Sequence, residues 1–237
     1  MISDVQPITT TYPSDTRSCQ AQSHWFGSFQ ETITAIAKQQ FTIYTVISNE
    51  RIQELRESRK EWSNVRKIAF GIGDAASRFV TQMIAGGVIF RIASLLFDTD
   101  NVTTGIGEGT PLTFLAVVLK GPVAEELIFR GLLQNAISLI QEGAKMVAPE
   151  SLTENHIFVW LTSDSCRIIA TNLTFAAVHM MNAGLYLSTA GAISQVAVIV
   201  LFASQSLTYE TTGDLGSAMS SHIANNFIAY CLMKLAS

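Results

Sequence analysis

The feature that most constrains the fold is a series of apolar segments, each long enough to cross a membrane as a helix. They cover residues 68–97, 112–140, 157–181, 185–204 and 217–235, and we expect loops between them at 98–111, 141–156 and 205–216. About 20 apolar residues span the hydrocarbon core, where each backbone N–H and C=O group must be bonded within its own helix. We therefore predict an all-α fold, a polytopic transmembrane helix bundle that encloses a polar site.

Composition agrees with this class and excludes several others. Only 14% of the 237 residues are charged, against about 25% in soluble domains. The formal net charge of -4 and the lack of a basic stripe argue against nucleic-acid binding. Cys19, Cys166 and Cys231 are scattered and odd in number, which argues against a disulfide framework and a cysteine zinc site. The first residues lack a signal peptide, so we expect the internal spans to direct insertion.

Three regions follow along the chain. Residues 1–28 are polar and are expected to be disordered. Residues 29–66 have apolar side chains at helical spacing and then alternating charges at 50–61, which predicts an amphipathic helix followed by a solvated helical face. Residues 67–237 form the transmembrane domain. Within its first span, Asp74 and Arg78 are four residues apart and are predicted to neutralise each other.

The second span contains three charges, in the sequence GPVAEELIFRGLLQ at 121–134. A charge near the centre of a membrane helix costs roughly 2.5–3.5 kcal/mol on insertion scales and marks a functional site by default. Glu126 and Arg130 are four residues apart on one helix face, which predicts an ion pair. Glu125 lies about 100° round the helix without such a partner. A lone carboxylate in a dry site is suited to act as a base.

Two further apolar segments carry histidine at helical spacing. Phe175 and His179 share one face of their segment, where the aromatic ring could pack against the imidazole and orient it. His222 and Asn226 share a face of the last segment. Burying these groups without partners would cost several kcal/mol. We therefore expect the three helices to face one polar cavity.

Such a cavity supports hydrolysis of a peptide bond. Glu125 can take a proton from water, His179 can hold that water or a metal, and His222 with Asn226 can donate hydrogen bonds to an oxyanion. The zinc-helix motif H-E-x-x-H is absent. Two histidines, His179 and His222, with a carboxylate such as Glu125 would still hold a divalent metal, zinc above all, with an open water position. Activation with and without metal both stay open.

The ordered set EELIFR, FAAVH and HIANN resembles the motifs of the CPBP family, the CAAX-processing and bacteriocin-processing intramembrane proteases also called Abi. The resemblance covers about 111–234. It implies a membrane-embedded endopeptidase, usually described as a metalloprotease, that acts on a membrane-associated protein or peptide through CAAX-type or leader-peptide processing. It assigns water activation to Glu125, supporting roles to Glu126 and Arg130, and the remaining site positions to His179, His222 and Asn226. Family members commonly have more spans before the first motif than the one found here.

Other functions are weighed against this one. A non-catalytic membrane scaffold or bacteriocin-immunity protein could keep the motif residues for structure. A transporter or proton relay lacks support from paired broken helices in a repeat. A serine or cysteine mechanism would use Ser220, Ser221 or Cys166, which have no sequence context typical of a nucleophile. In every case the bilayer is an expected partner, and we expect an integral multi-pass protein, placed in a bacterial inner membrane.

Overall fold

The computed structural model describes residues 30–35, 48–97, 99, 114–183, 188–202 and 204–236. Within these residues every regular element is a helix and there is no strand, which confirms the all-α prediction. The predicted disorder of residues 1–28 lies outside the described residues, as does nearly all of the predicted loop at 98–111.

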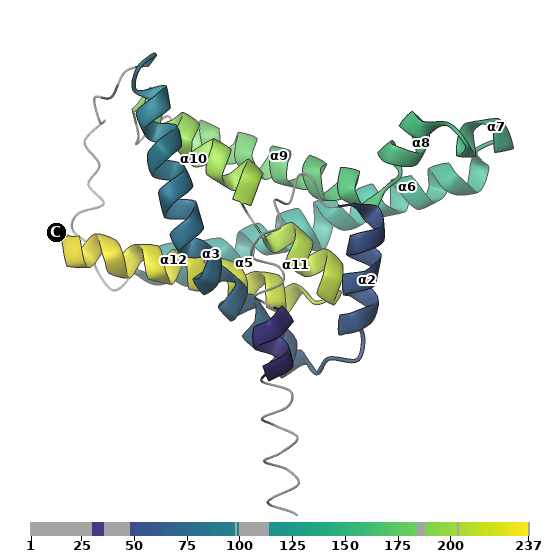
Figure 1. The fold of residues 1–237 in the computed structure, drawn as a ribbon, viewed down its shortest axis with the longest axis horizontal. Coiled ribbons are helices and arrows are strands. Elements are labelled where there is room, and N and C mark those ends of the chain that lie inside the picture. Colours follow the sequence, from purple (N-terminus) through teal and green to yellow (C-terminus); the bar gives the residue numbers. More distant parts are fainter. Residues whose placement is uncertain are drawn as a thin grey trace, which may run out of the picture.

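The helices of the first half lead into one long helix that changes its winding. Their bounds are α2 (Asn49–Arg59), α3 (Asn64–Ala93), η3 (Leu115–Lys120), α5 (Gly121–Glu126), η4 (Leu127–Gln134) and α6 (Asn135–Val147) (Figure 1). The segments η3 and η4 are π-helical, with i→i+5 hydrogen bonds. Residues 114–147 are helical throughout, so the predicted second span is present as a helix and continues beyond its expected end.

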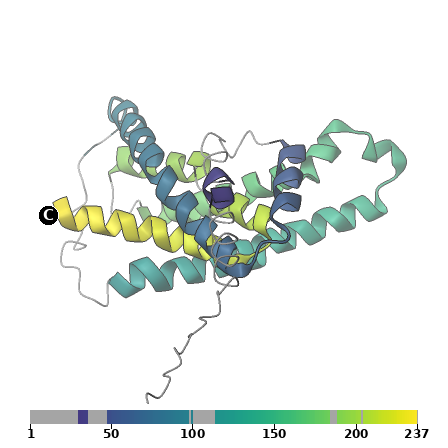
Figure 2. The ribbon, with the colours of Figure 1, turned by 60° about the horizontal axis from the view of Figure 1, so that its bottom comes forward.

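The second half completes the bundle. Its helices are α7 (Glu150–Thr153), α8 (His156–Leu161), α9 (Asp164–Ala183), α10 (Thr189–Phe202), α11 (Gln205–Thr212) and α12 (Leu215–Ala236). Helix α12 packs between α3 and α5, which is part of the continuous helix of residues 114–147. Helix α10 packs against both α3 and α9 (Figures 1 and 2). The hairpin of α6, α7 and α8 extends away from the other helices (Figure 1).

Helices α3 and α12 approach each other so closely that only glycine fits at their crossing. A Cβ atom added to Gly71 would lie 2.2 Å from the backbone oxygen of Ser217. Close by, the Ser220 hydroxyl donates a hydrogen bond to the backbone oxygen of Ile68 at 3.1 Å. This contact fixes the position of α12, the helix that carries the HIANN motif.

Many polar and charged side chains are buried beside the apolar core, and many large apolar side chains are exposed. Glu126, Arg130 and Asn172 are at most 1% exposed. Large apolar side chains such as Ile84 and Leu139 are exposed instead, along with many others on the outer helix faces. An extensive exposed apolar surface is typical of contact with a membrane or a partner.

One described stretch is long and apolar enough to count as a candidate membrane span, Thr189–Thr212, with a mean hydropathy of 1.6. It overlaps the predicted span at 185–204. The other four predicted spans do not qualify in the described residues. Three of them, at 68–97, 112–140 and 157–181, contain acidic and basic residues that lower their hydropathy. The predicted pair of Asp74 and Arg78 is among these residues, with Asp74 Oδ1 2.8 Å from Arg78 Nε and both side chains buried.

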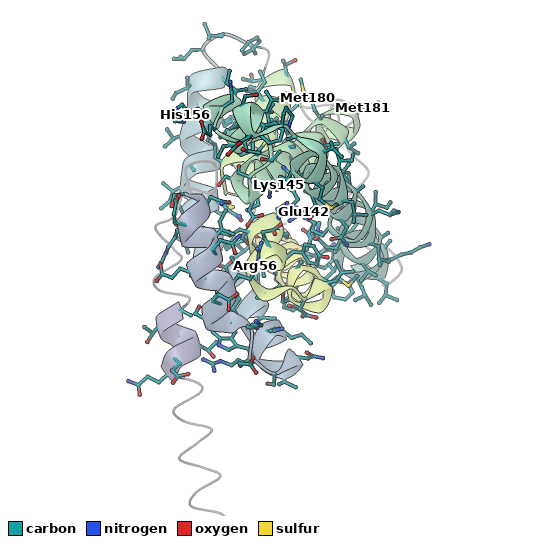
Figure 3. The ribbon with its side chains drawn as sticks, turned by 90° about the vertical axis from the view of Figure 1, so that its right-hand side faces the viewer. Arg56, Glu142, Lys145, His156, Met180 and Met181 are labelled. Atoms are coloured by element: carbon teal, nitrogen blue, oxygen red, sulfur yellow. The ribbon has the colours of Figure 1, made fainter. Side chains whose placement is uncertain are left out.

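The prediction for the region at 29–66 is wrong in two respects. Ser48 has an extended backbone and caps α2, so one helix does not continue from 29 to 55. The charged face of α2 is also not simply solvated. Arg56, which is labelled in Figure 3, forms ion pairs with Glu210 and, at 3.1 Å, with Asp164. Arg59 is buried and donates a hydrogen bond to Thr211 at 2.6 Å. Long-range partners of this kind leave no signal in the local charge pattern.

Two element boundaries also differ from the prediction. The expected span at 157–181 is divided into α8 and α9, because α8 ends at Leu161 and a new helix begins at Asp164. The expected loop at 205–216 contains α11, which ends at Gly213 in the left-handed conformation (φ 61°). Glycine adopts this conformation at no steric cost, so Gly213 is a well-formed helix end.

Candidate active site

The three motifs, which are far apart in the sequence, converge on one carboxylate. Helix α5 carries Glu125, α9 carries His179 and α12 carries His222. Glu125 Oε2 lies 3.7 Å from Nε2 of His179 and 3.6 Å from Nε2 of His222. The Glu125 side chain is 34% exposed, so its carboxylate faces both imidazole rings and is open to a third group.

The neighbouring glutamate lies in a different environment. Glu126 is fully buried, and its Oε2 is 3.3 Å from Nε of Arg130, so the predicted ion pair is present. Its Oε1 is 2.8 Å from Nδ1 of His222. An ionised carboxylate only accepts hydrogen bonds, so Nδ1 of His222 is the donor. Glu126 therefore also orients His222, a contact that the helical spacing did not predict.

His179 is oriented by its own helix. Its Nδ1 lies 3.0 Å from the backbone oxygen of Phe175. A carbonyl oxygen only accepts, so Nδ1 carries the proton and donates. In the neutral ring this leaves the lone pair of Nε2 directed toward Glu125.

Phe175 packs against three of the site's polar groups. Its ring centroid is 4.2 Å from that of His179 and 5.8 Å from that of His222. The Arg130 guanidinium lies over the ring face, 4.6 Å from the centroid, in a cation–π contact. The ring therefore contacts all three groups and limits the rotation of both imidazoles.

Asn226 makes a contact that follows from the π-helical winding of η3. A π-helix pairs each N–H with the carbonyl five residues earlier, so the partner of residue 122 would be Val117. Residue 122 is Pro122, which has no N–H. Asn226 Nδ2 donates to the Val117 carbonyl at 3.1 Å and supplies the missing bond. Asn226 thus ties α12 to the helix that carries both glutamates.

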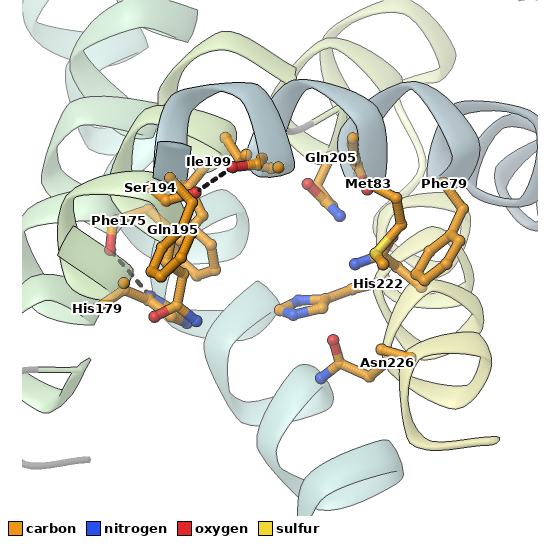
Figure 4. A pocket seen from close by; sticks show the side chains of 18 residues that line it. Phe79, Met83, Phe175, His179, Ser194, Gln195, Ile199, Gln205, His222 and Asn226 are labelled. Carbon is orange, nitrogen blue, oxygen red and sulfur yellow. Dashed lines mark hydrogen bonds between the residues drawn. The ribbon is translucent and has the colours of Figure 1, made fainter. Parts of the chain in front are cut away.

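A cavity of about 610 Å³ opens beside these residues. His179, His222 and Asn226 line it together with side chains from α3, α10 and α11 (Figure 4). Glu125 is not one of the lining residues and reaches the two imidazoles from α5. The lining residues that the sequence analysis missed include Gln205 and Asn225. Asn225 lies three positions after His222, which could have pointed to it, whereas Gln205 fell in a segment expected to be a loop.

The predicted metal site at His179, His222 and Glu125 stays a prediction. No group of three His, Cys, Asp or Glu side chains among the described residues is arranged to hold a metal ion. The donor types of Glu125, His179 and His222 are those that zinc uses.

Taken together, the described residues define an all-helical protein with a partly exposed Glu-His-His site beside a cavity. The family model for type II CAAX prenyl endopeptidase Rce1-like proteins matches residues 107–228, just over half of the chain, and the three motifs lie inside the match. The chain belongs to this family, as the resemblance in its motifs implied. Membership implies peptidase activity in a membrane. No curated protein and no solved structure matches the chain.

Proposed function

We propose that this protein is an intramembrane endopeptidase that uses glutamate-activated water to cleave a peptide bond near the prenylated end of a membrane-associated protein. The observation that carries the proposal is the convergence of Glu125 with His179 and His222 within 3.7 Å. The family name supports the substrate class, because a CAAX sequence is a C-terminal signal for prenylation of its cysteine.

The membrane environment in the proposal is a multi-pass helix bundle. Its support is the burial of charged pairs such as Asp74–Arg78 and Glu126–Arg130, together with the many large apolar side chains that are exposed. Buried pairing of this kind satisfies charges that hydrocarbon cannot. A prenylated substrate would share the bilayer with the enzyme, and the cavity beside the histidines would receive its peptide.

In the proposed reaction, Glu125 removes a proton from a water molecule as the oxygen attacks the peptide carbonyl carbon. The Nε2 lone pair of His179 accepts the second hydrogen of that water and fixes its orientation. His222, protonated on both nitrogens, donates to Glu126 through Nδ1 and to the oxyanion through Nε2. Glu125 then returns its proton to the leaving amine as the C–N bond breaks, which balances the hydrolysis.

Asn226 and the buried residues support these steps. The second N–H of the Asn226 carboxamide is available to the oxyanion, since one is used on Val117. Glu126 and Arg130 hold His222 and neutralise each other, and Phe175 keeps both rings in place. Glu126 and Arg130 are fully buried and cannot contact a substrate, whereas Glu125 is partly exposed. The two glutamates therefore have different roles.

Zinc bound by His179 and His222, with Glu125, is a separate proposal that rests on donor type alone. A metal there would polarise the carbonyl and acidify water. Elemental analysis of protein purified without chelator tests it directly. We expect one zinc per chain that is lost in a His179→Ala, His222→Ala double variant; parent protein that is fully active at substoichiometric zinc content would contradict it.

The function is tested with purified protein in liposomes and a synthetic farnesylated peptide that ends in a CAAX sequence. Mass spectrometry should find cleavage on the carboxyl side of the prenylated cysteine, and the same peptide without its prenyl group should be cleaved much more slowly. If the protein cleaves neither peptide, and a Glu125→Ala, His179→Ala double variant still rescues a cellular deletion phenotype, the non-catalytic scaffold is the correct function.

A further inference from the structure

Two carboxamides in the cavity beside the histidines have buried acceptor atoms with no hydrogen-bond partner in the described residues. Gln205 is only 5% exposed, and its Oε1 is buried without a partner. Asn225 Oδ1 is buried without a partner as well. Both side chains line the cavity, which His179 and His222 also line. Gln205 lies across the open space from His222 (Figure 4).

A buried acceptor without a donor is unfavourable, because it has lost its hydrogen bonds to water and gained none. Native proteins keep such groups rarely, and each one needs an explanation. Gln205 begins α11 and Asn225 lies within α12, so these unpaired acceptors belong to side chains from different helices that line the same cavity. A ligand that brings N–H donors into the cavity would satisfy both.

The remaining lining residues show which donors the cavity can accept. No lysine, arginine, aspartate or glutamate among the described residues lines it. Much of its wall is apolar, including Phe79, Met83, Phe90, Val198 and Ile199. A charged ligand group would lose its hydration without finding a counter-charge there. The complementary ligand therefore has apolar side chains and uncharged N–H donors, which is the chemistry of an extended apolar peptide.

We propose that Gln205 and Asn225 accept hydrogen bonds from main-chain N–H groups of the substrate and so position the scissile bond. This inference rests on the proposed peptidase function and deepens it. An extended peptide that enters a site enclosed by membrane helices cannot leave its N–H groups unpaired. Asn225 is three residues from His222 on α12, so the two lie on neighbouring positions of one helix face. The peptide main chain held there passes next to the proposed oxyanion site.

Binding is measured first, separately from catalysis. In the Glu125→Gln background, the affinity of a fluorescent farnesylated CAAX peptide is determined by anisotropy. We expect Gln205→Met and Asn225→Leu, which keep side-chain size but remove the acceptor, each to raise Kd about three- to tenfold, the effect of one lost hydrogen bond. Gln30→Met, the same change at an exposed glutamine that does not line the cavity, should leave Kd unchanged.

A set of N-methylated peptides then identifies the donor. Methylation of the one main-chain nitrogen that Gln205 recognises should weaken binding to the parent background and have little further effect on Gln205→Met. Methylation at neighbouring nitrogens should either weaken binding to both proteins equally or leave binding to both unchanged. A purely structural role for Gln205 would give the same methylation profile with and without the variant. If Gln205→Met lowers the unfolding temperature strongly, Asn225→Leu provides the same test at the second acceptor.

The outcomes separate this inference from the proposed function. The inference is overturned if Kd is unchanged in both Gln205→Met and Asn225→Leu, or if the methylation profile is the same with and without Gln205→Met. In that case the proposed peptidase function still stands, provided that the parent protein cleaves the peptide. A parent protein that cleaves no peptide, or a Glu125→Gln variant that cleaves as fast as the parent, overturns the proposed function instead. Coupling between Gln205 and a single peptide nitrogen supports both.

Discussion

Glu125 and Glu126 are adjacent in the chain, yet they differ in burial and in the residues that they contact. Glu126 is fully buried and contacts Arg130 and His222 through different oxygens. Glu125 is partly exposed and lies within 3.7 Å of two imidazole nitrogens. One glutamate is enclosed on all sides by the protein, and the other can still meet water and substrate. This contrast is the physical basis for assigning the base to Glu125.

At the residue scale we predict that Glu126→Ala destabilises the protein by about 3–5 kcal/mol, because it leaves the Arg130 charge buried without its carboxylate. His222 also loses its hydrogen bond. The measurement is the free energy of unfolding in mixed micelles with increasing denaturant. Glu142→Ala, at an exposed glutamate paired only with Lys145, is the control and should change stability by less than about 1 kcal/mol. Equal stability of the Glu126→Ala variant and the parent would show that the ion pair is not structural.

Residue-level prediction from sequence succeeded where partners lie on one helix. The pairs Glu126–Arg130 and Asp74–Arg78 are both four residues apart, and both are present. Contacts between helices could not be predicted in the same way. The hydrogen bond from His222 to Glu126 joins residues 96 positions apart and depends on how α12 packs against α5. Spacing along one helix carries no information about that packing.

At the scale of elements, close helix packing explains how the site is assembled. The crossing of α3 and α12 at Gly71 brings the HIANN motif alongside α5, and the bond from Asn226 to Val117 fastens α12 to η3. Pro122 leaves that carbonyl without an intrahelical donor, so the irregular winding provides an attachment point for another helix. Irregular turns of this type are frequent at functional sites.

We predict that Gly71→Ala disrupts this crossing. The added methyl group would sit 2.2 Å from a backbone oxygen, which cannot move without displacing α12. Both unfolding temperature and peptidase activity should fall. Gly143→Ala is the matched control, because nothing lies within 4 Å of its Cβ position. That change should be neutral or stabilising by up to about 1 kcal/mol, since alanine favours a helix over glycine. A Gly71→Ala variant with parental stability and activity would refute the close crossing.

Prediction of elements from sequence was accurate for helix type and less so for boundaries. The long apolar runs correctly indicated α3 and α12. Helix α11 was expected as a loop, because its QSLTYETT sequence is polar. Its side chains are nevertheless largely buried, and Leu207 packs with Ile52 and Ile168. Tertiary packing stabilises this helix, and local propensity alone does not reveal it.

At the scale of the whole molecule, the buried polar network and exposed apolar surface are consistent with a membrane-embedded peptidase family. We predict that the chain stays in the membrane fraction after extraction with alkaline carbonate. Ile84→Lys, at an exposed apolar position on α3, should reduce the inserted fraction, because a central lysine costs roughly 2.5–3.5 kcal/mol. Glu142→Lys, on an exposed charged position, should not. Quantitative release of the parent by carbonate would contradict the membrane-embedded bundle.

The class of protein was the part of the whole most accessible from sequence, since three ordered motifs on apolar segments indicated the family that the chain proves to belong to. The cavity and the role of Gln205 were not accessible, because Gln205 becomes a neighbour of the histidines only through the packing of α10, α11 and α12.

The central claim, that Glu125 is the base, is tested most directly by the single-turnover rate of cleavage of the farnesylated CAAX peptide by Glu125→Gln. General base catalysis contributes about 10²- to 10⁴-fold. We predict that the Glu125→Gln rate constant is lower than that of the parent by about 10²-fold or more. The unfolding temperature of the variant should equal that of the parent. The control Glu142→Gln, at an exposed position, should cleave the peptide at the parental rate. A purified, folded Glu125→Gln protein that cleaves the peptide at the parental rate would contradict the account.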